Sequence, residues 1–433
     1  MKSARQTAFE ILNKIQRDGS YSNLALDAVL DKSNIDTKEK KLASALVYGV
    51  IERRITLDYN IGLYLSQPLK KLKPQALTAL RIGAYQILFM DKIPDSAAVN
   101  ESVTLVKKNG AAFAGGLVNA VLRKIAANGL KTDGSMSVKF SAPEWLCEMW
   151  EKSYGTENAE KILEASFGAV ETVLRVNTEK TDSNDLIELL SSEGFEAEEN
   201  PKAADSLVLK SGGAVHKTNC YKKGHFHVQD TASQLCCKAL CVRPVDTVID
   251  LCAAPGGKSF TLAEMMKNSG KVLSCDIYEH RLKLIKDGAD RLGLTNIETM
   301  LNDGSAYNAS IPKVDKILCD VPCSGLGVIR KKPEIRYKKS DEVDKLGDLQ
   351  YAILCVSSNY LKIGGELVYS TCSLNPDENE KIIEKFLSEH NDFESVKVLP
   401  ELKRYNGETD YVTLMPHIHG CDGFFISKIK RIR

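Results

Sequence analysis

The chain has 433 residues, of which 43% are hydrophobic and 27% are charged, and its formal net charge is +1. This length is too great for one core and predicts two or three domains. No apolar run reaches the roughly eighteen residues of a membrane-spanning helix. The twelve cysteines include no CxxC pair, which argues against a zinc ribbon or a secreted disulfide framework and favours reduced thiols in the cytoplasm.

Residues 1–130 are predicted to form an all-helical domain of about five to seven helices. Ala4, Ala8, Ile11, Leu12 and Ile15 recur at helical spacing, and later stripes follow without a strand signal. This part holds 19 Lys and Arg against 11 Asp and Glu, whereas the rest holds 39 against 46. The basic excess favours contact with a polyanion, although solvated helix faces would explain it equally well. The candidate phosphate contacts are Arg5, Arg53, Arg54, Lys107, Lys108, Arg123 and Lys124.

Residues 131–165 are predicted to be a helical linker, in which Ser141 caps a helix that has Pro143 in its first turn. The periodicity then changes. VETVLRVN (170–177) and SLVLK (206–210) resemble strands, with a short helix at 184–194 between them. The pattern predicts a small α+β module over residues 166–220. Its place between a basic helical domain and the next domain suggests a role facing RNA.

Residues 221–433 are predicted to form one α/β domain. Strand patterns such as TVIDLC (247–252), KVLSCDI (271–277) and GELVYSTCS (365–373) alternate with helical stretches. Helical connections of about ten to fifteen residues predict a parallel, doubly wound, Rossmann-like sheet. The segments 410–416 and 423–432 have no helix between them and are expected to close the sheet as an antiparallel hairpin.

The stretch DTVIDLCAAPGGKS (246–259) is predicted to be a strand, a tight glycine turn and a helix N-terminus. Unpaired N–H groups at such a helix start favour an anionic or nucleotide-like ligand. A phosphate-binding P-loop would need glycine at position 252, which is Cys252. The next strand ends in Asp276, about twenty residues on, where an acid suits ribose hydroxyls. We therefore expect an S-adenosylmethionine site, with a P-loop or a purely structural turn as the alternatives.

Ligands gather at the carboxyl ends of strands in an open α/β sheet. Those ends carry Asp250 and Cys252, Asp276, Asp303, Asp320 with Cys323, and finally Cys372. A simple O- or N-methyltransferase needs no pair of thiols beside the methyl donor. Methylation at carbon-5 of a pyrimidine does need a thiol, because a thiolate that adds to carbon-6 makes carbon-5 nucleophilic. A carboxyl group near N3 relieves the charge that develops during this addition. Spacing alone does not decide which cysteine attacks.

Several motifs resemble those of the RNA cytosine-5 methyltransferase family of the Sun type. They are HVQDTASQL (227–235), DLCAAPGGK (250–258), DVPCSGLG (320–327), STCS (370–373) and HGCDGFF (419–425). In addition, VNESVTLVKK (99–108) and LVNAVLRKIA (117–126) look like the closing helices of the NusB-type RNA-binding domain. The resemblance implies a NusB-like domain at 1–130 and a Rossmann-like methyltransferase domain at 221–433.

The same resemblance assigns roles to residues. Cys372 would be the nucleophile, Cys323 would assist release of the product, and Asp320 would pair with the base, whereas the DNA cytosine methyltransferases would instead nominate Cys323 for the attack. Val321 stands where the family usually has alanine. Its larger β-branched side chain is expected to narrow the pocket but removes no functional group. The implied cofactor-binding residues are Cys252, Ala253, Ala254, Pro255, Gly256, Gly257, Lys258, Asp276, Asp303 and Asp320.

Three other stretches can be interpreted either as functional sites or as ordinary structural features. RKKPEIRYKK (330–339) is interpreted as a phosphate clamp with Tyr337 available for base stacking, or else as a solvated charge run. The acids of NPDENE (375–380) are explained by the dipole of a helix that starts there. His417, His419 and Cys421 offer no fourth ligand, so no metal is predicted.

The sequence thus predicts a monomeric cytoplasmic enzyme that uses S-adenosylmethionine to methylate carbon-5 of a cytidine in 16S rRNA, the small-subunit RNA or its precursor. The same chemistry on tRNA is the enzymatic alternative. The other alternative is a NusB-like RNA-binding assembly factor that has lost its activity. The presence of Cys372, Cys323 and Asp320 argues against it.

Overall fold

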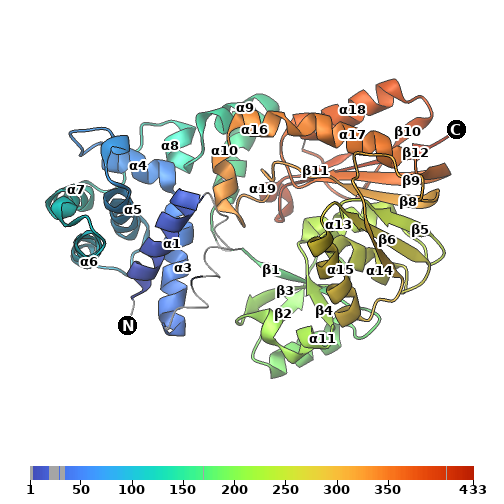
Figure 1. Ribbon diagram of the computed structural model, residues 1–433, viewed down its shortest axis with the longest axis horizontal. Coiled ribbons are helices and arrows are strands. Elements are labelled where there is room, and N and C mark those ends of the chain that lie inside the picture. Colours follow the sequence, from blue (N-terminus) through green and yellow to red (C-terminus); the bar gives the residue numbers. More distant parts are fainter. Residues whose placement is uncertain (1–2, 19–28, 30–34, 169, 406) are drawn as a thin grey trace. The chain divides into compact units, whose positions relative to one another are not determined.

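The computed structural model describes residues 3–18, 29, 35–168, 170–405 and 407–433 (Figure 1). The chain divides into two compact units. One comprises Met1–Phe167 with Ile329–Lys338, and the other comprises Gly168–Val328 with Lys339–Arg433. In the described ranges, every helix is too short or too polar to cross a membrane.

The first unit is helical, which confirms the prediction of an all-α domain. Leu46, Leu57, Ile61, Leu80 and Leu122 are fully buried in its core, and Pro74 begins α5, where its missing N–H is harmless. The main helices are α1 (Ala4–Asp18), α3 (Thr37–Glu52), α4 (Arg54–Gly62), α5 (Pro74–Phe89), α6 (Asp95–Lys108) and α7 (Gly115–Asn128), with 3-10 turns η1 (Leu69–Lys71) and η2 (Ala112–Ala114).

Residues 131–165, the predicted linker, form three helices within this first unit: α8 (Met136–Phe140), α9 (Glu144–Tyr154) and α10 (Thr156–Ala165). The prediction that Ser141 caps the helix after it is wrong. Pro143 occupies the cap position of α9, so Ser141 lies too early to reach the free N–H groups of that helix. Ser141 instead ends α8 with a left-handed φ of 53°, and its Oγ accepts the Ile55 N–H at 2.9 Å.

The basic segment after residue 328 also belongs to the first unit, through η4 (Pro333–Tyr337). Arg336 is only 1% exposed. Its Nη1 donates to the backbone oxygens of Glu52 and Phe140 at 3.1 and 3.2 Å, and its Nη2 donates to Ser166 Oγ at 3.1 Å. Arg336 therefore joins α3, α8 and the end of α10, and it is not available to hold a phosphate.

Tyr337 is likewise part of the helical unit, which corrects its predicted role in base stacking. Its hydroxyl donates to the Ile51 carbonyl at 2.7 Å, and the Arg54 guanidinium lies 3.6 Å from its ring centroid. The ring also packs against the helical core. A side chain held at its hydroxyl and covered on a ring face is not a platform for a nucleotide base.

The second unit begins with a small antiparallel sheet of order β2-β3-β1-β4. Its core contains Leu174, Leu186, Leu207 and Phe226. The predicted strand, helix and strand are β1 (Thr172–Val176), α11 (Ser183–Ser192) and β3 (Ser206–Ser211), and the remaining elements are β2 (Glu196–Glu199), η3 (Val215–Lys217), α12 (Asn219–Lys222) and β4 (Phe226–Val228). The strand β4 extends the sheet beyond residue 220.

The larger sheet has the order β10-β12-β9-β8-β5-β6-β7, and β11 pairs with β12. The five strands from β9 to β7 are parallel, and β12 runs antiparallel to β9, β10 and β11. This confirms the predicted Rossmann-like sheet and the antiparallel pairing of the last two segments. A short helix, α19 (Pro416–His419), lies between them, where none was expected, and β12 lies inside the sheet because it also pairs with β9 and β10. The strands are β5 (Thr247–Asp250), β6 (Lys271–Asp276), β7 (Ile297–Leu301), β8 (Val314–Asp320), β9 (Leu361–Thr371), β10 (Phe393–Val396), β11 (Val412–Leu414) and β12 (Phe424–Arg431).

Helices cover both faces of this sheet (Figure 1). Successive side chains of a strand point to opposite faces, so Val248 packs with α13, α14 and α15, whereas Ile249 packs with α17 and α18. The helices are α13 (Thr231–Leu240), α14 (Gly257–Met265), α15 (Glu279–Leu292), α16 (Ser340–Asp344), α17 (Leu346–Ser358), α18 (Glu380–Glu389) and α19 (Pro416–His419), with η5 (Pro376–Glu378) before α18.

The strand order reverses between β5 and β8. From β5 the chain moves outward through β6 and β7, and then returns to β8 on the other side of β5. Such a switch point leaves a crevice at the carboxyl ends of the two central strands, where α/β proteins bind their ligands.

Candidate functional site

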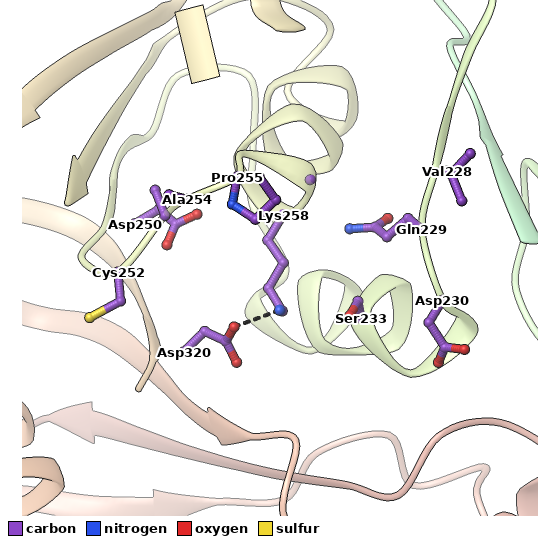
Figure 2. Close-up of a pocket in the computed structure, with 12 residues that line it drawn as sticks. Val228, Gln229, Asp230, Ser233, Asp250, Cys252, Ala254, Pro255, Lys258 and Asp320 are labelled. Atoms are coloured by element: carbon purple, nitrogen blue, oxygen red, sulfur yellow. Dashed lines mark hydrogen bonds and ion pairs between the residues drawn. The ribbon is translucent and has the colours of Figure 1, made fainter. Parts of the chain in front are cut away.

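A cavity of about 260 Å³ lies at this switch point (Figure 2). One part of its lining comes from the glycine turn and the end of β8, and the other comes from the segment that leads from β4 into α13. The lining residues are Val228, Gln229, Asp230, Ser233, Asp250, Cys252, Ala253, Ala254, Pro255, Gly257, Lys258 and Asp320.

The glycine turn has the backbone geometry that its sequence suggests. Gly256 has a φ of 110°, and a Cβ at this position would come within 2.4 Å of the Phe260 ring. Gly257 then starts α14, so the first N–H groups of that helix lie next to the cavity. Cys252 is largely buried, and burial raises the pKa of its thiol well above the usual value, so this side chain is a neutral part of the wall.

Asp250 is a buried carboxyl group that holds the glycine turn in place. It is 1% exposed, and its Oδ2 accepts the Ser259 hydroxyl at 2.7 Å. Burial raises the pKa of Asp250 from 3.8 to about 7, an effect that the Ser259 hydrogen bond only partly offsets. The carboxyl group therefore ties the end of β5 to the first turn of α14.

Lys258 and Asp320 form an ion pair across the cavity, with 2.6 Å between Nζ and Oδ2 (Figure 2). The other carboxylate oxygen of Asp320 accepts the Ser370 hydroxyl at 2.8 Å. Burial acts to lower the pKa of Lys258, but the charge of Asp320 outweighs it with help from neighbouring thiols, and the net pKa is raised. Lys258 is thus a permanent cation that fixes Asp320 at the end of β8.

Asp276 and Asp303 lie at the ends of the next two strands, outside the lining of this cavity. Asp276 is 4% exposed, accepts the Tyr278 N–H at 3.1 Å and pairs with Arg281 at 3.3 Å. Asp303 is exposed, and the hydroxyl and N–H of Ser305 donate to it at 2.6 and 2.9 Å, which lowers its pKa.

Cys323 and Cys372 are brought together by the ends of β8 and β9. Their Sγ atoms are 3.2 Å apart. The pKa of Cys323 is raised well above its usual value, first by its hydrogen bond with Cys372 and then by burial. Ser370, two residues before Cys372, is the hydroxyl that bonds Asp320, so the thiol pair and the cavity share the ends of the same two strands.

The loop of HGCDGFF (419–425) contacts the loop that carries Cys323. The Gly327 N–H donates to the Cys372 carbonyl at 2.9 Å, and the Gly423 N–H donates to the Gly327 carbonyl at 2.9 Å. A Cβ on Gly327 would come within 1.9 Å of the Gly423 carbonyl oxygen. Gly327 and Gly423 are therefore required by the close approach of the two loops.

The histidines beside Cys421 take part in ordinary contacts. The Nδ1 of His419 accepts the Met415 N–H at 2.8 Å, and burial lowers the pKa of this imidazole. Across the described parts of the chain, no group of three or more His, Cys, Asp or Glu side chains has the arrangement of a metal site.

Comparison with known proteins places three domains in succession along the chain. Residues 2–127 match the NusB family, residues 142–216 match the ferredoxin-like domain described as Methyltr_RsmF/B-like, and residues 237–430 match the 16S rRNA methyltransferase RsmB/F. A protein of Bacillus subtilis (strain 168), named "probable ribosomal RNA small subunit methyltransferase B", is 39% identical over 99% of both chains. The chain belongs to the RsmB/F family of 16S rRNA methyltransferases.

Solved structures agree with this membership. The crystal structure of PH0851 superposes with a TM-score of 0.84 at 25% identity and covers 100% of this chain and 99% of that one. The structure of NSun6 from Pyrococcus horikoshii with SFG has a TM-score of 0.63 at 22% identity, and covers 67% of this chain and 98% of that one. The second likeness shows that the fold is shared.

The RsmB/F site includes residues to which the sequence reasoning gave no role. Gln229, which follows β4, is 6% exposed and its side chain points toward Lys258 (Figure 2). Its Oε1 accepts the Thr261 hydroxyl at 2.7 Å, while its Nε2 is a buried donor without a protein acceptor. Gln229 belongs to the motif HVQDTASQL, so the sequence did mark its position. The motif alone does not show that a side chain next to the small sheet lines the cavity of the larger sheet.

Proposed function

We propose that this RsmB/F enzyme transfers a methyl group from S-adenosylmethionine to carbon-5 of a cytidine in 16S rRNA, through a covalent adduct with a cysteine. The observation that carries the proposal is the 3.2 Å separation of Cys323 Sγ and Cys372 Sγ beside the strand ends that hold Asp320. A methyl transfer to oxygen or nitrogen needs no such pair, whereas addition to carbon-6 of the base and later elimination can use both thiols.

The residues around the cavity fit S-adenosylmethionine. The N-terminus of α14 and the unpaired Gln229 amide offer N–H donors, and the buried Asp276 carboxylate suits ribose hydroxyls. We propose that the turn from Cys252 to Lys258, with Asp276, Asp303 and Asp320, holds this cofactor, which supplies the methyl group. The fold relative NSun6 was solved with SFG, an analogue of S-adenosylmethionine.

Cys372 is the proposed nucleophile. The 3.2 Å between the two sulfur atoms allows Cys323 to donate its proton toward the sulfur of Cys372, and this hydrogen bond and burial raise the pKa of Cys323, which agrees with that direction. A donated hydrogen bond favours the thiolate form of its acceptor. The Cys372 thiolate would then add to carbon-6 of the cytosine, which places the electron pair of the former 5,6 double bond at carbon-5. Carbon-5 would take the methyl group as the bond from that methyl group to the sulfonium sulfur breaks, and S-adenosylhomocysteine would leave.

Asp320 and Cys323 act on the same base. Asp320 lies at the end of β8 with one oxygen on Lys258 and the other on Ser370, where it can pair with the base, and the Lys258 cation beside it can offset the negative charge that develops near N3 during addition. After methyl transfer, carbon-5 loses its proton and the bond between Cys372 and carbon-6 breaks, which restores the aromatic ring. Cys323 assists this release.

The NusB-like helices are proposed to bind the RNA through exposed cations. Among the seven predicted phosphate contacts, Arg5 donates to Gln86 at 2.7 Å, Arg53 lies 3.5 Å from the Phe167 ring centroid, and Arg54 covers Tyr337. Those three have structural roles. The remaining four, on α6 and α7, have exposed side chains and are the better candidates: Lys107, Lys108, Arg123 and Lys124. We expect a monomer that acts in the cytoplasm, where ribosomes are assembled.

One assay tests the function. The protein is incubated with methyl-labelled S-adenosylmethionine and with separate pools of small-subunit rRNA and tRNA, and the label is mapped to nucleotides. The expected result is 5-methylcytidine in the rRNA pool. Label confined to tRNA would overturn the substrate, label on another atom would overturn the chemistry, and RNA binding without any label would favour an inactive assembly factor.

A further inference from the structure

Glu378 is buried between the two loops that carry the cysteines. Only 1% of the surface of Glu378 is exposed. The N–H of Ser324, the residue after Cys323, donates to Oε2 at 2.7 Å. The hydroxyls of Ser324 and of Ser373, the residue after Cys372, donate to Oε1 at 2.5 and 2.7 Å. One carboxylate thus accepts from the residue that follows each cysteine.

A second layer of contacts fixes Glu378 itself. Gln350 of α17 donates from Nε2 to Oε2 of Glu378 at 3.0 Å and to the Pro322 carbonyl at 2.9 Å. The buried Tyr369 hydroxyl donates to the Glu378 carbonyl at 2.6 Å. Glu378 is therefore held at its carboxylate by α17 and at its backbone carbonyl by β9. Pro322, on the other side of Cys323, accepts from the same Gln350 amide.

Asn379 completes the arrangement on the Cys372 side. Its Nδ2 donates to the Ser373 carbonyl at 3.0 Å, and its Oδ1 accepts the Thr371 hydroxyl at 2.5 Å. Both residues that flank Cys372 are therefore held by one amide. The helix dipole, which was expected to explain the acids of this segment, accounts for an exposed residue such as Asp377 but not for the fully buried Glu378.

Burial of a carboxylate is costly unless its oxygens receive several hydrogen bonds. At Glu378 every partner is a donor, as an ionised carboxylate requires. Such a network is rigid and keeps its members in one geometry. Because its members flank Cys323 and Cys372, this rigidity fixes the separation of the two sulfur atoms.

We propose that Glu378, with Asn379, is a positioning residue that holds Cys323 and Cys372 at reacting distance. It is not among the residues that line the cavity, and it acts through the two loops. The proposal deepens the proposed function, on which it rests for the meaning of the cysteine pair. A loss of register of about 1 Å can cost about a hundredfold in rate, so a displaced loop would slow the methyl transfer without weakening cofactor binding.

The test compares Glu378→Ala and Glu378→Gln with Asp377→Ala as the matched control. Asp377 is the neighbouring acid, is exposed and pairs only at the surface with Lys381. The first measurement needs no RNA. Diamide takes one hydrogen from each of two thiols, so that a Cys323–Cys372 disulfide forms as the diazene is reduced to the hydrazine, and the rate reports how readily the two sulfurs meet.

We expect Glu378→Ala to lower the rate of this disulfide formation about tenfold and kcat of methylation about a hundredfold, with KM for S-adenosylmethionine unchanged. Glu378→Gln keeps the shape and one acceptor oxygen, so it should recover most of both rates. Asp377→Ala should match the wild type. If Glu378→Ala fails to fold, as judged by its thermal unfolding, the double variant Ser324→Ala with Ser373→Ala removes two of the four donors and should shift both rates in the same direction.

Unchanged disulfide and methylation rates in Glu378→Ala would overturn the positioning role. A rise in KM for the cofactor with kcat unchanged would also overturn it. If the wild type methylates no RNA but Glu378→Ala still slows disulfide formation, the proposed function fails while the positioning role stands.

Discussion

The sulfur atoms of Cys323 and Cys372 lie 3.2 Å apart although 49 positions of sequence separate the two residues. The parallel pairing of β8 with β9 brings the two loops to one edge of the sheet. At this separation the two thiols share a hydrogen bond, and the pKa of Cys323 is raised. Two thiols that share a hydrogen bond titrate as a coupled pair, in which the second proton is held more tightly than the first. A nucleophile with a proton-bearing partner requires this property.

The two cysteines should fail in different ways when substituted. Cys372→Ala removes the proposed nucleophile and should abolish methylation. Cys323→Ala keeps the nucleophile, although without the hydrogen bond that favours its thiolate, and removes the partner that assists release, so a covalent complex between protein and RNA should accumulate. Denaturing gel electrophoresis with labelled RNA and S-adenosylmethionine detects this complex. An adduct with Cys372→Ala and none with Cys323→Ala would exchange the two roles.

The ion pair of Lys258 with Asp320 should support both stability and activity. Lys258→Met leaves the largely buried Asp320 carboxylate without its cation, and we expect a loss of about 2 kcal/mol in the free energy of unfolding of the catalytic domain. Methylation should fall at least about tenfold, because Asp320 is no longer fixed. Calorimetric unfolding and initial rates measure the two effects.

The double variant Lys258→Met with Asp320→Asn separates these effects. With the charge also removed at position 320, most of the stability should return, since no unpaired charge stays buried. Activity should not return if Asp320 acts on the base. Recovery of methylation together with stability would show that Asp320 has only a structural role.

Much of the site could be predicted because its signals are local. The strand, glycine turn and helix start around Gly256 need only neighbouring residues, and Asp276 follows at the spacing of a nucleotide site. The meeting of Cys323 with Cys372 followed from one rule, that parallel strands end at a common edge.

The errors arose where packing depends on distant parts of the chain. Arg336 and Tyr337 are basic and aromatic in sequence, but they bond backbone oxygens 196 to 286 positions away, and no charge count reports which domain a segment joins. Glu378 was overlooked for the opposite reason. A local explanation, the helix dipole, was sufficient for its charge, so that nothing in the sequence suggested burial beneath the cysteine loops.

The basic segment at 329–338 should separate into structural and exposed positions. Arg336→Met removes the hydrogen bonds to Glu52, Phe140 and Ser166 and should destabilise the helical unit by about 3 kcal/mol. Lys332→Ala alters an exposed side chain in the same segment and should leave the thermal unfolding temperature unchanged. If Arg336→Met were as stable as the wild type, the buried contacts of this arginine would have no energetic importance.

The exposed cations of α6 and α7 should govern the salt dependence of RNA binding. Each phosphate contact contributes about 0.7 to 0.9 to the slope of log K against log salt concentration. A fourfold alanine variant should therefore reduce the slope by about 3; its positions are Lys107, Lys108, Arg123 and Lys124. The control replaces four lysines whose charges are already paired with carboxylates, and its slope should not change: Lys161, Lys283, Lys381 and Lys397. Equal slopes for both variants would remove these helices from the RNA interface.

Asp250 should make the apo protein less stable as the pH rises toward neutrality. Its pKa is about 7 in the folded protein against 3.8 ordinarily, so the folded state holds a proton that the unfolded state has lost between these values. Stability from this group is complete below pH 4 and is lost as the pH rises to about 7, by a total of about 4 kcal/mol. Asp250→Asn mimics the protonated form and keeps a partner for Ser259, so its unfolding temperature should rise relative to the wild type from pH 4 to pH 7 and stay higher above it. A constant difference across this range would mean that Asp250 is already ionised at pH 4, and that burial does not raise its pKa.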